Sequence, residues 1–129
     1  MYFWLMDENE ISFAIRGTIF KVYYLLGPGL LESVYVAALA FELGKTMDVK
    51  MQVPIPVIYE NEQMELGFRI DLLVNNKVII EVKSVENLAA VHHKQLLTYL
   101  KLTGMKLGIL VNFNVAKIET GIFRKVNKL

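Results

Sequence analysis

Apolar residues recur at helical spacing near the start of the chain, at Ile11, Ile15, Ile19 and Val22. This spacing predicts an amphipathic helix over residues 7–26, with Asp7 or Asn9 as the residue that caps its start. Gly27-Pro28-Gly29 then breaks the pattern. The next segment, 30–45, is rich in Leu and Ala and predicts a second helix that ends near Gly44.

The middle of the chain changes to the two-residue period of strands. Residues 49–59 alternate apolar and other positions but hold two prolines, which predicts an edge strand. Residues 60–63 are polar and predict a turn. The segments 64–74 and 78–85 are predicted to be two strands joined around Asn75-Asn76-Lys77. β-Branched residues, which favour strands, are concentrated in the second segment.

The C-terminal part predicts one helix and two strands. Residues 88–103 form a helical pattern that stops at Gly104, and 107–113 are almost wholly apolar, which is typical of a strand buried on both faces. Residues 117–126 alternate loosely and predict a last strand. The order is therefore ααβββαββ, an α/β sandwich around a mixed β-sheet.

The composition fits a single folded domain over residues 1–129. Hydrophobic residues make up 54% of the 129 residues and charged residues 21%, which argues against disorder and low complexity. No cysteine is present, so disulfides, thiol catalysis and Cys-based metal sites are excluded, and a reducing, cytoplasmic location is expected. Residues 1–5 read as an N-terminal extension, with Met1 and Met6 both open as the natural start.

Hydropathy and charge add two expectations. The mean hydropathy is high, at +0.39, yet no apolar stretch approaches the ~20 residues that cross a bilayer. We therefore expect no membrane contact, and we attribute the surplus to self-association, as in a homodimer. Residues 1–82 carry 6 basic and 11 acidic side chains, whereas residues 83–129 carry 8 and 2. The C-terminal part could thus face a polyanion such as nucleic acid.

Three ionisable residues interrupt the two central strands: Asp71, Glu81 and Lys83. Glu81 and Lys83 are two residues apart, so they project from the same face of their strand. A three-residue loop at 75–77 would place Asp71 directly opposite Glu81, with Cβ atoms ~4.5–5.5 Å apart. A two-residue turn would instead send the two acids to opposite faces. The functional interpretation requires the odd loop.

Two carboxylates at that separation repel each other by about 4 kcal/mol at ~4 Å and an effective dielectric of ~20. A divalent cation offsets this repulsion, and oxygen ligands without cysteine favour Mg²⁺ or Mn²⁺. The alternative is a solvated strand face on which Glu and Lys occur by chance. The spacing alone favours that alternative, because an E-x-K triplet is common.

The flanking motifs change that balance. An acid, a β-hairpin, E-x-K and a helix resemble the PD-(D/E)XK nuclease superfamily. The segment from Gly29 to Tyr35 reads G-x-x-E-x-x-Y, Gln95 to Leu100 reads Gln-Leu-Leu-Thr-Tyr-Leu, and Gly108 to Phe113 reads Gly-Ile-Leu-Val-Asn-Phe. Together they resemble the GxxExxY protein family, from about Met6 to the end of the chain. The resemblance implies a restriction-endonuclease-like αβββαβ core.

The resemblance also implies roles for individual residues. Asp71 and Glu81 would bind the metal, joined by the backbone carbonyl of Val82 and by Glu32 from the helix. Lys83 would orient the attacking water and stabilise charge on the phosphate. Gln95 and Tyr99 match the Q-x-x-x-Y pattern of RecB-type exonucleases, in which the glutamine helps position the lysine and the phosphate.

Several of these residues also have a plain structural explanation. An acid at Glu32, in the first turn of a helix, is favoured by the helix dipole. Tyr99 could be a core aromatic whose hydroxyl is satisfied. His92 shares a helix face with Gln95 and is a candidate phosphate neighbour or simply a surface residue. Arg69 could contact a phosphate or pair with Glu81.

Three further positions qualify the resemblance. Ile70 stands where the superfamily name has proline, a position that is often relaxed. Tyr23 stands where relatives commonly carry histidine, so no role of that histidine transfers. Tyr35 is expected to brace its helix by packing.

These residues predict a nuclease that hydrolyses phosphodiester bonds of DNA or RNA with Mg²⁺ or Mn²⁺. The alternative is a catalytically weak or inactive nuclease-fold module that binds nucleic acid or protein as a scaffold. All the acids and the lysine are present, which favours the enzyme.

Overall fold

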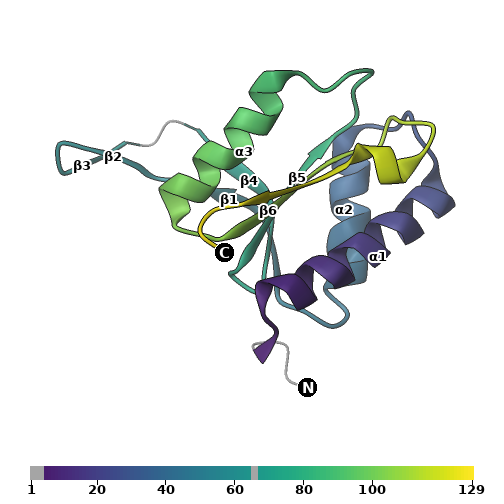
Figure 1. Ribbon diagram of the computed structural model, residues 1–129, viewed down its shortest axis with the longest axis horizontal. Helices are drawn as coiled ribbons and strands as arrows, with labels where there is room; N and C mark the ends of the chain where they lie inside the picture. Colours follow the sequence, from purple (N-terminus) through teal and green to yellow (C-terminus); the bar gives the residue numbers. More distant parts are fainter. Residues whose placement is uncertain (1–4, 65–66) are drawn as a thin grey trace.

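The computed structural model describes residues 5–64 and 67–129. Within these residues the elements are, in chain order, α1 (Glu8–Leu26), α2 (Glu32–Leu43), β1 (Val49–Pro54), β2 (Val57–Tyr59), β3 (Glu62–Met64), β4 (Arg69–Val74), β5 (Val78–Lys83), α3 (Ala90–Thr103), β6 (Leu107–Asn112), the short 3₁₀ helix η2 (Ile118–Gly121) and β7 (Ile122–Val126). Figure 1 shows the helices on both sides of a central sheet.

The central sheet has the strand order β1-β4-β5-β6-β7. β5 and β6 are parallel and the other neighbours are antiparallel, because α3 carries the chain back across the sheet between them. The predicted α/β class, with a mixed sheet flanked by helices, is confirmed. β6 is buried along its whole length, as its apolar sequence predicts.

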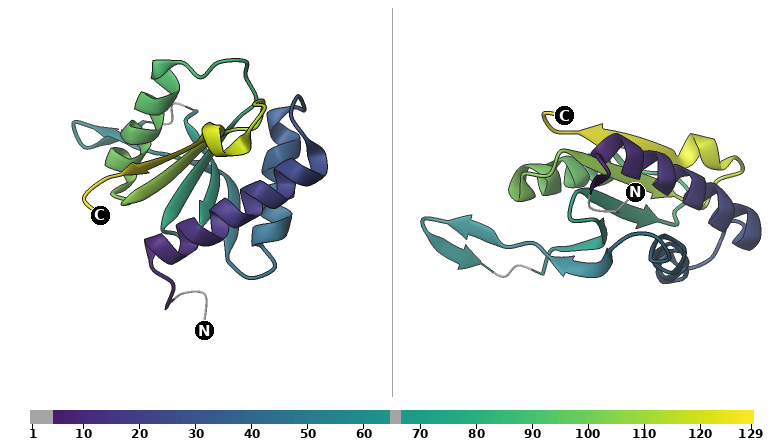
Figure 2. Two further views of the ribbon diagram at one scale, coloured as in Figure 1. Left: turned by 45° about the vertical axis from the view of Figure 1, so that its right-hand side comes forward. Right: turned by 90° about the horizontal axis from the view of Figure 1, so that it is seen from below.

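Two separate hydrophobic cores hold the layers together. α1 and α2 cover one face of the sheet with a core that includes Ile15, Leu39 and Ile80, and α3 covers the other face with Ile79 and Leu96. Figure 2 shows this arrangement from two further directions. Gly108 allows α3 to approach β6 closely, since a Cβ there would lie 2.7 Å from Leu96 Cδ1. Among the described residues, no helix is long and apolar enough to span a membrane.

The first helix begins as predicted. Asp7 accepts a hydrogen bond from the Glu10 N–H at 2.8 Å, and Glu10 accepts one from the Asp7 N–H at 3.1 Å. This reciprocal capping box satisfies two amide groups that a helix start leaves without partners. Asp7, rather than Asn9, is therefore the capping residue.

The tight corner between α1 and α2 is fastened by a tyrosine. The Tyr35 hydroxyl donates to the Gly27 carbonyl at 2.6 Å and accepts from the Leu30 N–H at 3.1 Å. Its ring is fully buried and stacks on Phe113 at 4.2 Å between centroids. Tyr35 thus braces its helix, and it does so by hydrogen bonding as well as by packing.

The prediction of one continuous strand over 49–59 is wrong. The structure divides it at Ile55-Pro56 into β1, an edge strand, and β2, which pairs only with β3. Prolines at 54 and 56 have no N–H to donate to a ladder. Between them, the Ile55 N–H leaves the pattern and donates to the Phe68 carbonyl. β2 and β3 therefore form a hairpin that extends from the body of the protein (Figures 1 and 2).

Other boundaries also differ from the prediction. The turn of that hairpin is only Glu60-Asn61, both with positive φ, so Gln63 lies in a strand. The prediction of one strand over 64–74 is wrong, because β3 ends at Met64 and β4 begins at Arg69. Residues 65–66 lie outside the described part of the chain. The last segment, 117–126, begins as the 3₁₀ helix η2 and becomes a strand only at Ile122.

Candidate active site

The β4–β5 hairpin sets the positions of the central acids. Its register pairs Val74 with Val78, Leu73 with Ile79 and Leu72 with Ile80, so the loop is the three-residue Asn75-Asn76-Lys77. Both asparagines adopt positive φ, which this residue type tolerates better than most. Asn75 is also anchored outside the loop, because it exchanges hydrogen bonds with Asp48. The predicted odd loop is confirmed, and Asp71 and Glu81 occupy opposite positions of the hairpin.

At Asp71 and Glu81, hydrogen bonds from backbone to side chain take the place of backbone hydrogen bonds between β4 and β5. The Val82 N–H donates to Asp71 Oδ2 at 2.8 Å, and the Asp71 N–H donates to Glu81 Oε1 at 3.3 Å. The backbone pairing of the two strands ends one step earlier, at Leu72 and Ile80. Each carboxyl group is thus fixed by the backbone of the opposite strand.

Strand β4 also changes face here. Leu72 joins the core under α1 and α2, whereas Ile70, two residues away, joins the core under α3. Regular alternation would keep both on one side of the sheet. The break between them lies at Asp71, where the carboxyl groups separate the strands.

The environment of Glu81 is electrostatically costly. Only 5% of the residue is exposed. Burial, then the charge of Asp71 and a side-chain hydrogen bond with it, raise the pKa of the Glu81 carboxyl to about 9, although Lys83 and the Asp71 backbone act in the opposite direction. The pair therefore retains one proton at neutral pH. Strongly shifted carboxyl pKa values of this kind concentrate at functional sites.

Lys83 follows on the same strand. It is half-buried at the end of β5, and its charge lowers the pKa of Glu81. None of the acids in the described part of the chain forms an ion pair with its amine. Val82, the residue between Glu81 and Lys83, packs its side chain into the core and donates its N–H to Asp71. The Lys83 amine is thus close enough to influence the acid pair electrostatically and forms no ion pair with an acid of the described residues.

Glu32 lies in the first turn of α2, but not with the other two acids. Its Oε2 accepts a hydrogen bond from the Ser84 N–H at 3.2 Å, and the Ser84 hydroxyl donates to the Leu30 carbonyl at 2.6 Å. These bonds tie the start of α2 to the residue after Lys83. Across residues 5–64 and 67–129, no three Asp, Glu or His side chains gather closely enough to hold a metal ion. The structure joins Glu32 to the end of β5 rather than to the pair itself.

Helix α3 brings Tyr99 to the acids. Tyr99 is buried, and burial followed by the charges of Glu81 and Asp71 raises the pKa of its hydroxyl. Its ring lies 6.2 Å from that of Phe68, between centroids. Tyr99 is therefore both a core aromatic and a neighbour of the carboxyl pair. Gln95 is half-buried one helical turn earlier on α3.

His92 and Arg69 have structural partners in this structure. The His92 Nδ1 accepts from the Ala89 N–H at 3.1 Å, which caps the start of α3. The Arg69 Nη1 donates to the Gln52 carbonyl at 3.5 Å, and Arg69 forms no ion pair with Glu81. Of the two explanations for Arg69, pairing with Glu81 is excluded, and a phosphate contact stays a prediction.

Tyr23 also has a structural partner. Its hydroxyl donates towards the carbonyls of Val115 and Ala116, at 2.6 and 3.0 Å. This contact ties α1 to the loop after β6, so a tyrosine here has a structural reason of its own.

Sequence reasoning gave no role to two residues beside the site. Ser84 links β5 to α2 through both its N–H and its hydroxyl, and Phe68 shields one side of Tyr99 while 40% of it stays exposed. An aromatic residue directly before the strand that carries Asp71 was the available signal for Phe68. No periodic pattern marks Ser84, because its role depends on a contact with a helix 52 positions away.

The donor set suits a hard divalent cation. Asp71 and Glu81 offer only oxygen atoms, and burial together with the charge of Asp71 raises the pKa of Glu81 and keeps its carboxyl protonated. A cation between them would remove the repulsion between the two carboxylates and displace the proton. Mg²⁺ and Mn²⁺ prefer such carboxylate and carbonyl ligands. The residues present therefore fit a divalent metal.

Comparison with known proteins gives one match. A family model described as the PD-(D/E)XK nuclease superfamily matches residues 9–125, nearly the whole chain. Neither the curated proteins nor the solved structures yielded a match. The match covers both helices of the tight corner, the acid pair, Lys83 and the residues on α3.

Proposed function

Because the chain belongs to the PD-(D/E)XK nuclease superfamily, we propose that it is a metal-dependent nuclease that hydrolyses phosphodiester bonds of DNA or RNA. The observation that carries this proposal is the opposition of Asp71 and Glu81 on β4 and β5, with Lys83 two residues farther along. Burying two neighbouring carboxyl groups costs free energy although each accepts a backbone N–H, and this cost favours a ligand that the two carboxylates share.

The residues that would hold Mg²⁺ or Mn²⁺ are Asp71 and Glu81, with the Val82 carbonyl. Glu32 accepts from the Ser84 N–H in this structure, so it would have to leave that hydrogen bond to join them. A bound ion would make a water molecule more acidic and offset negative charge on the phosphate. The chain prepares this site through its backbone, since each carboxyl is already held by the opposite strand. Such fixed ligands lose little entropy when they bind.

Lys83 would orient the attacking water and stabilise the charge that develops on the phosphate oxygens. Its amine has the freedom to do so because no acid in the described residues binds it as an ion pair. Gln95, half-buried on α3, would hold the lysine and the phosphate in position.

Tyr99, Arg69 and His92 would contact the substrate around this centre. The Tyr99 hydroxyl keeps its proton, because burial and the nearby acids raise its pKa, so it can donate to a phosphate oxygen. Arg69 has further N–H groups besides the one directed at Gln52. His92 accepts through Nδ1, which leaves Nε2 as a donor.

A cleavage assay tests the proposal. Plasmid DNA, single-stranded DNA and RNA are incubated with Mg²⁺ or Mn²⁺ and either wild type, Asp71→Asn or Lys83→Ala. We expect each variant to cleave about 10³-fold more slowly, because it removes charge at the reacting centre. Lys94→Ala, at an exposed position of α3, is the matched control and keeps wild-type activity.

Two outcomes would contradict the enzyme. Equal cleavage by wild type and both variants would identify the activity as a contaminant. Nucleic-acid binding without cleavage under every metal condition would favour the alternative, a nuclease-fold module that acts as a scaffold.

Self-association also stays a proposal. The faces of α1 and α2 expose large apolar side chains, among them Phe13, Leu25 and Phe41. Exposed apolar area of this kind favours contact with another protein surface. Light scattering at micromolar concentration would give twice the monomer mass if a homodimer forms, and the monomer mass would reject it.

A further inference from the structure

Strand β6 ends in a buried polar residue, Asn112, whose exposed fraction is only 3%. The other residues of this strand are apolar or glycine. The neighbours Val111 and Phe113 are both fully buried, so an apolar side chain would suit position 112 as well. Burying an amide costs free energy unless hydrogen bonds satisfy it. The reason for an asparagine at this position therefore lies in what its side chain binds.

The Asn112 amide binds backbone groups. Its Oδ1 accepts from the Val85 N–H at 3.1 Å and from the Asn114 N–H at 3.2 Å, and its Nδ2 donates to the Val85 carbonyl at 2.9 Å. The side chain thus offers Val85 a donor and an acceptor, as the backbone of a neighbouring strand would. Val85 lies beyond the end of β5, and there the amide takes over from the backbone pairing of β5 with β6.

Asn112 is itself held firmly in the protein. The next residue, Phe113, stacks on Tyr35 in the core under α1 and α2. Gly121, the last residue of η2, lies against the Asn112 backbone, and a Cβ at position 121 would overlap the Asn112 carbonyl. Because Asn112 is fixed on both counts, its amide fixes the chain that leaves β5.

That chain leaves the sheet at Lys83. Lys83 pairs with Asn112 in the parallel ladder, and its carbonyl accepts the Phe113 N–H at 3.0 Å. Paired positions of neighbouring strands project from the same face of a sheet. Leu110, two residues before Asn112, belongs to the core under α3, and Glu81 is two residues before Lys83. The Lys83 side chain therefore leaves the sheet beside the Asn112 amide, on the face that carries the acid pair.

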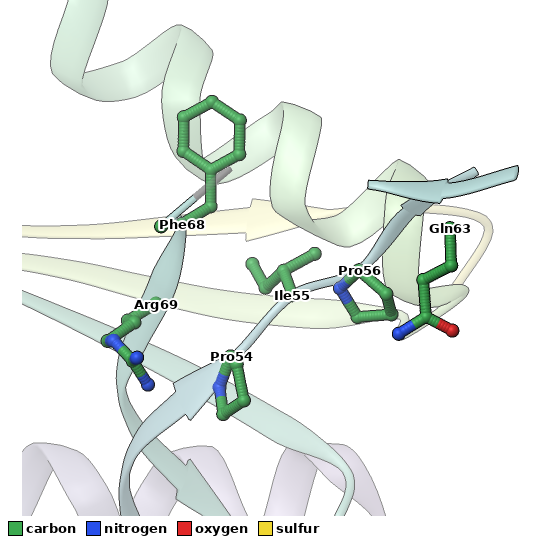
Figure 3. A pocket seen from close by; sticks show the side chains of 7 residues that line it. Pro54, Ile55, Pro56, Gln63, Phe68 and Arg69 are labelled. Carbon is green, nitrogen blue, oxygen red and sulfur yellow. The ribbon is translucent and has the colours of Figure 1, made fainter. Parts of the chain in front are cut away.

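Lys83 is the basic residue of the two central strands that shares this face. The other is Arg69, and in Figure 3 the Phe68 ring points towards α3 whereas the Arg69 side chain points to the other side of β4. A lysine stem is long and flexible, so the position of its amine depends on how firmly the backbone beneath it is held. Misplacing a catalytic group by about 1 Å can cost on the order of 10²-fold in rate.

We propose that Asn112 is a positioning residue for Lys83: its amide fixes the backbone of Val85 and so holds the end of β5, from which the lysine reaches the acid pair. The inference rests on the proposed nuclease function, in which Lys83 acts on the attacking water and the phosphate. Ser84 binds α2, on the other face of the sheet. The Asn112–Val85 contact therefore holds the chain on the face of the acid pair.

A spin label tests this contact without cleavage. The chain has no cysteine, so Lys83→Cys in the full chain gives one site for a nitroxide label, whose electron paramagnetic resonance line width in EDTA reports motion at position 83. Adding Asn112→Ala should make the label severalfold more mobile, because Val85 loses both its partners. Asn112→Ser should do the same. Serine is too short to reach Val85, but its hydroxyl can still accept from the Asn114 N–H, which favours a folded variant.

The matched control is Asn127→Ala. The Asn127 amide also donates to two backbone carbonyls, but at the opposite end of β6, where the Asn127 N–H binds the Lys106 carbonyl. This substitution therefore removes similar bonds and should leave the label at position 83 unchanged. If Asn112→Ala and Asn112→Ser also leave the label unchanged, the positioning role is overturned.

Kinetics separate positioning from stability. With Mg²⁺ or Mn²⁺ and the substrate that wild type cleaves best, Asn112→Ser should lower kcat on the order of 10²-fold. Its KM and its Kd for Mg²⁺ should stay within twofold of wild type, because the acids keep their places. Asn127→Ala, assayed well below its Tm, should keep the wild-type kcat. Equal loss of kcat in the two variants, or a parallel loss of metal affinity in Asn112→Ser, would assign the effect to stability and overturn the positioning role.

The two proposals fail separately. A wild type that cleaves normally, with kcat unchanged in Asn112→Ser, overturns the positioning role and leaves the nuclease standing. A wild type that never cleaves overturns the nuclease, while the mobility of the label at position 83 still decides whether Asn112 holds the end of β5.

Discussion

The two ends of the β4–β5 hairpin have opposite characters. At the turn end, apolar residues pair in regular register, with Leu72 opposite Ile80 and Val74 opposite Val78, all buried. At the other end, Asp71 and Glu81 take the places of ladder hydrogen bonds with their side chains, and one of them keeps a proton. The first end stabilises the fold, and the second carries an electrostatic cost that the retained proton reduces and that we expect a bound cation to offset.

The comparison shows how the apolar end of the hairpin fixes the positions of two acids that repel each other. The apolar end fixes the register, and the register alone brings the acids face to face. Two further hydrogen bonds, from the Ser84 N–H to Glu32 and from the Val82 N–H to Asp71, stabilise the end of the hairpin that carries the acids. The following predictions change one end at a time, from the largest expected effect to the smallest.

The largest effect on stability is expected at the apolar end. Ile80 is fully buried in the core under α1 and α2. Ile80→Ala should lower the free energy of unfolding by about 3–4 kcal/mol, because it leaves a cavity that the sheet cannot close. Urea unfolding measures this. Met51→Ala, at an exposed position on β1, is the control, and a similar loss there would contradict the assignment.

At the acid end, the metal-free protein should lose stability as the pH rises. The unfolded chain releases the Glu81 proton near the ordinary pKa of 4.5, whereas the folded protein holds it to about 9. Between these values the unfolded state binds fewer protons, so the free energy of unfolding falls with pH. We expect Tm in EDTA to fall by at least about 5 °C between pH 5 and pH 9.

Glu81→Gln sharpens this test, since glutamine resembles the protonated acid and can still accept from the Asp71 N–H. The Tm of this variant should equal that of wild type at pH 5 and exceed it at pH 9. A wild-type Tm profile that the substitution leaves unchanged would show that other groups set the pH dependence.

Binding of a divalent metal at Asp71 and Glu81 should offset their repulsion and stabilise the folded protein. Adding Mg²⁺ or Mn²⁺ at ten times its Kd stabilises the folded protein by about 1.4 kcal/mol. The shift in Tm should be larger at pH 8 than at pH 6, because the ion must displace the Glu81 proton. Asp71→Asn should abolish the shift while Ile80→Ala keeps it. A shift of equal size in Asp71→Asn would place the ion elsewhere.

The smallest effect is expected at Glu32. Glu32→Gln can still accept from the Ser84 N–H, so stability should change by less than about 0.5 kcal/mol. If Glu32 also assists the metal, calorimetry should show a severalfold weaker Mg²⁺ affinity. An unchanged affinity would restrict Glu32 to its role in joining α2 to β5.

Much of this hairpin was predictable from the sequence. Side chains alternate along a strand with a period of two, so the length of the loop at 75–77 was enough to decide whether Asp71 meets Glu81. The helices were equally clear, because their apolar spacing and the Gly27-Pro28-Gly29 break are local signals. The break within 49–59 was less clear, since prolines allow an edge strand as well as an interruption.

The sequence by itself determined the three helices, the two central strands and the chemical identity of the acid pair, because each depends on neighbours in the chain. The three-residue length of the β4–β5 loop and the division of residues 49–59 into two strands were decided by the structure. Only the tertiary structure decided that the carboxyl groups replace ladder bonds, that Glu32 binds Ser84 rather than joining the pair, and that His92 caps its own helix. These features depend on distances between residues far apart in sequence, and no local spacing encodes such distances.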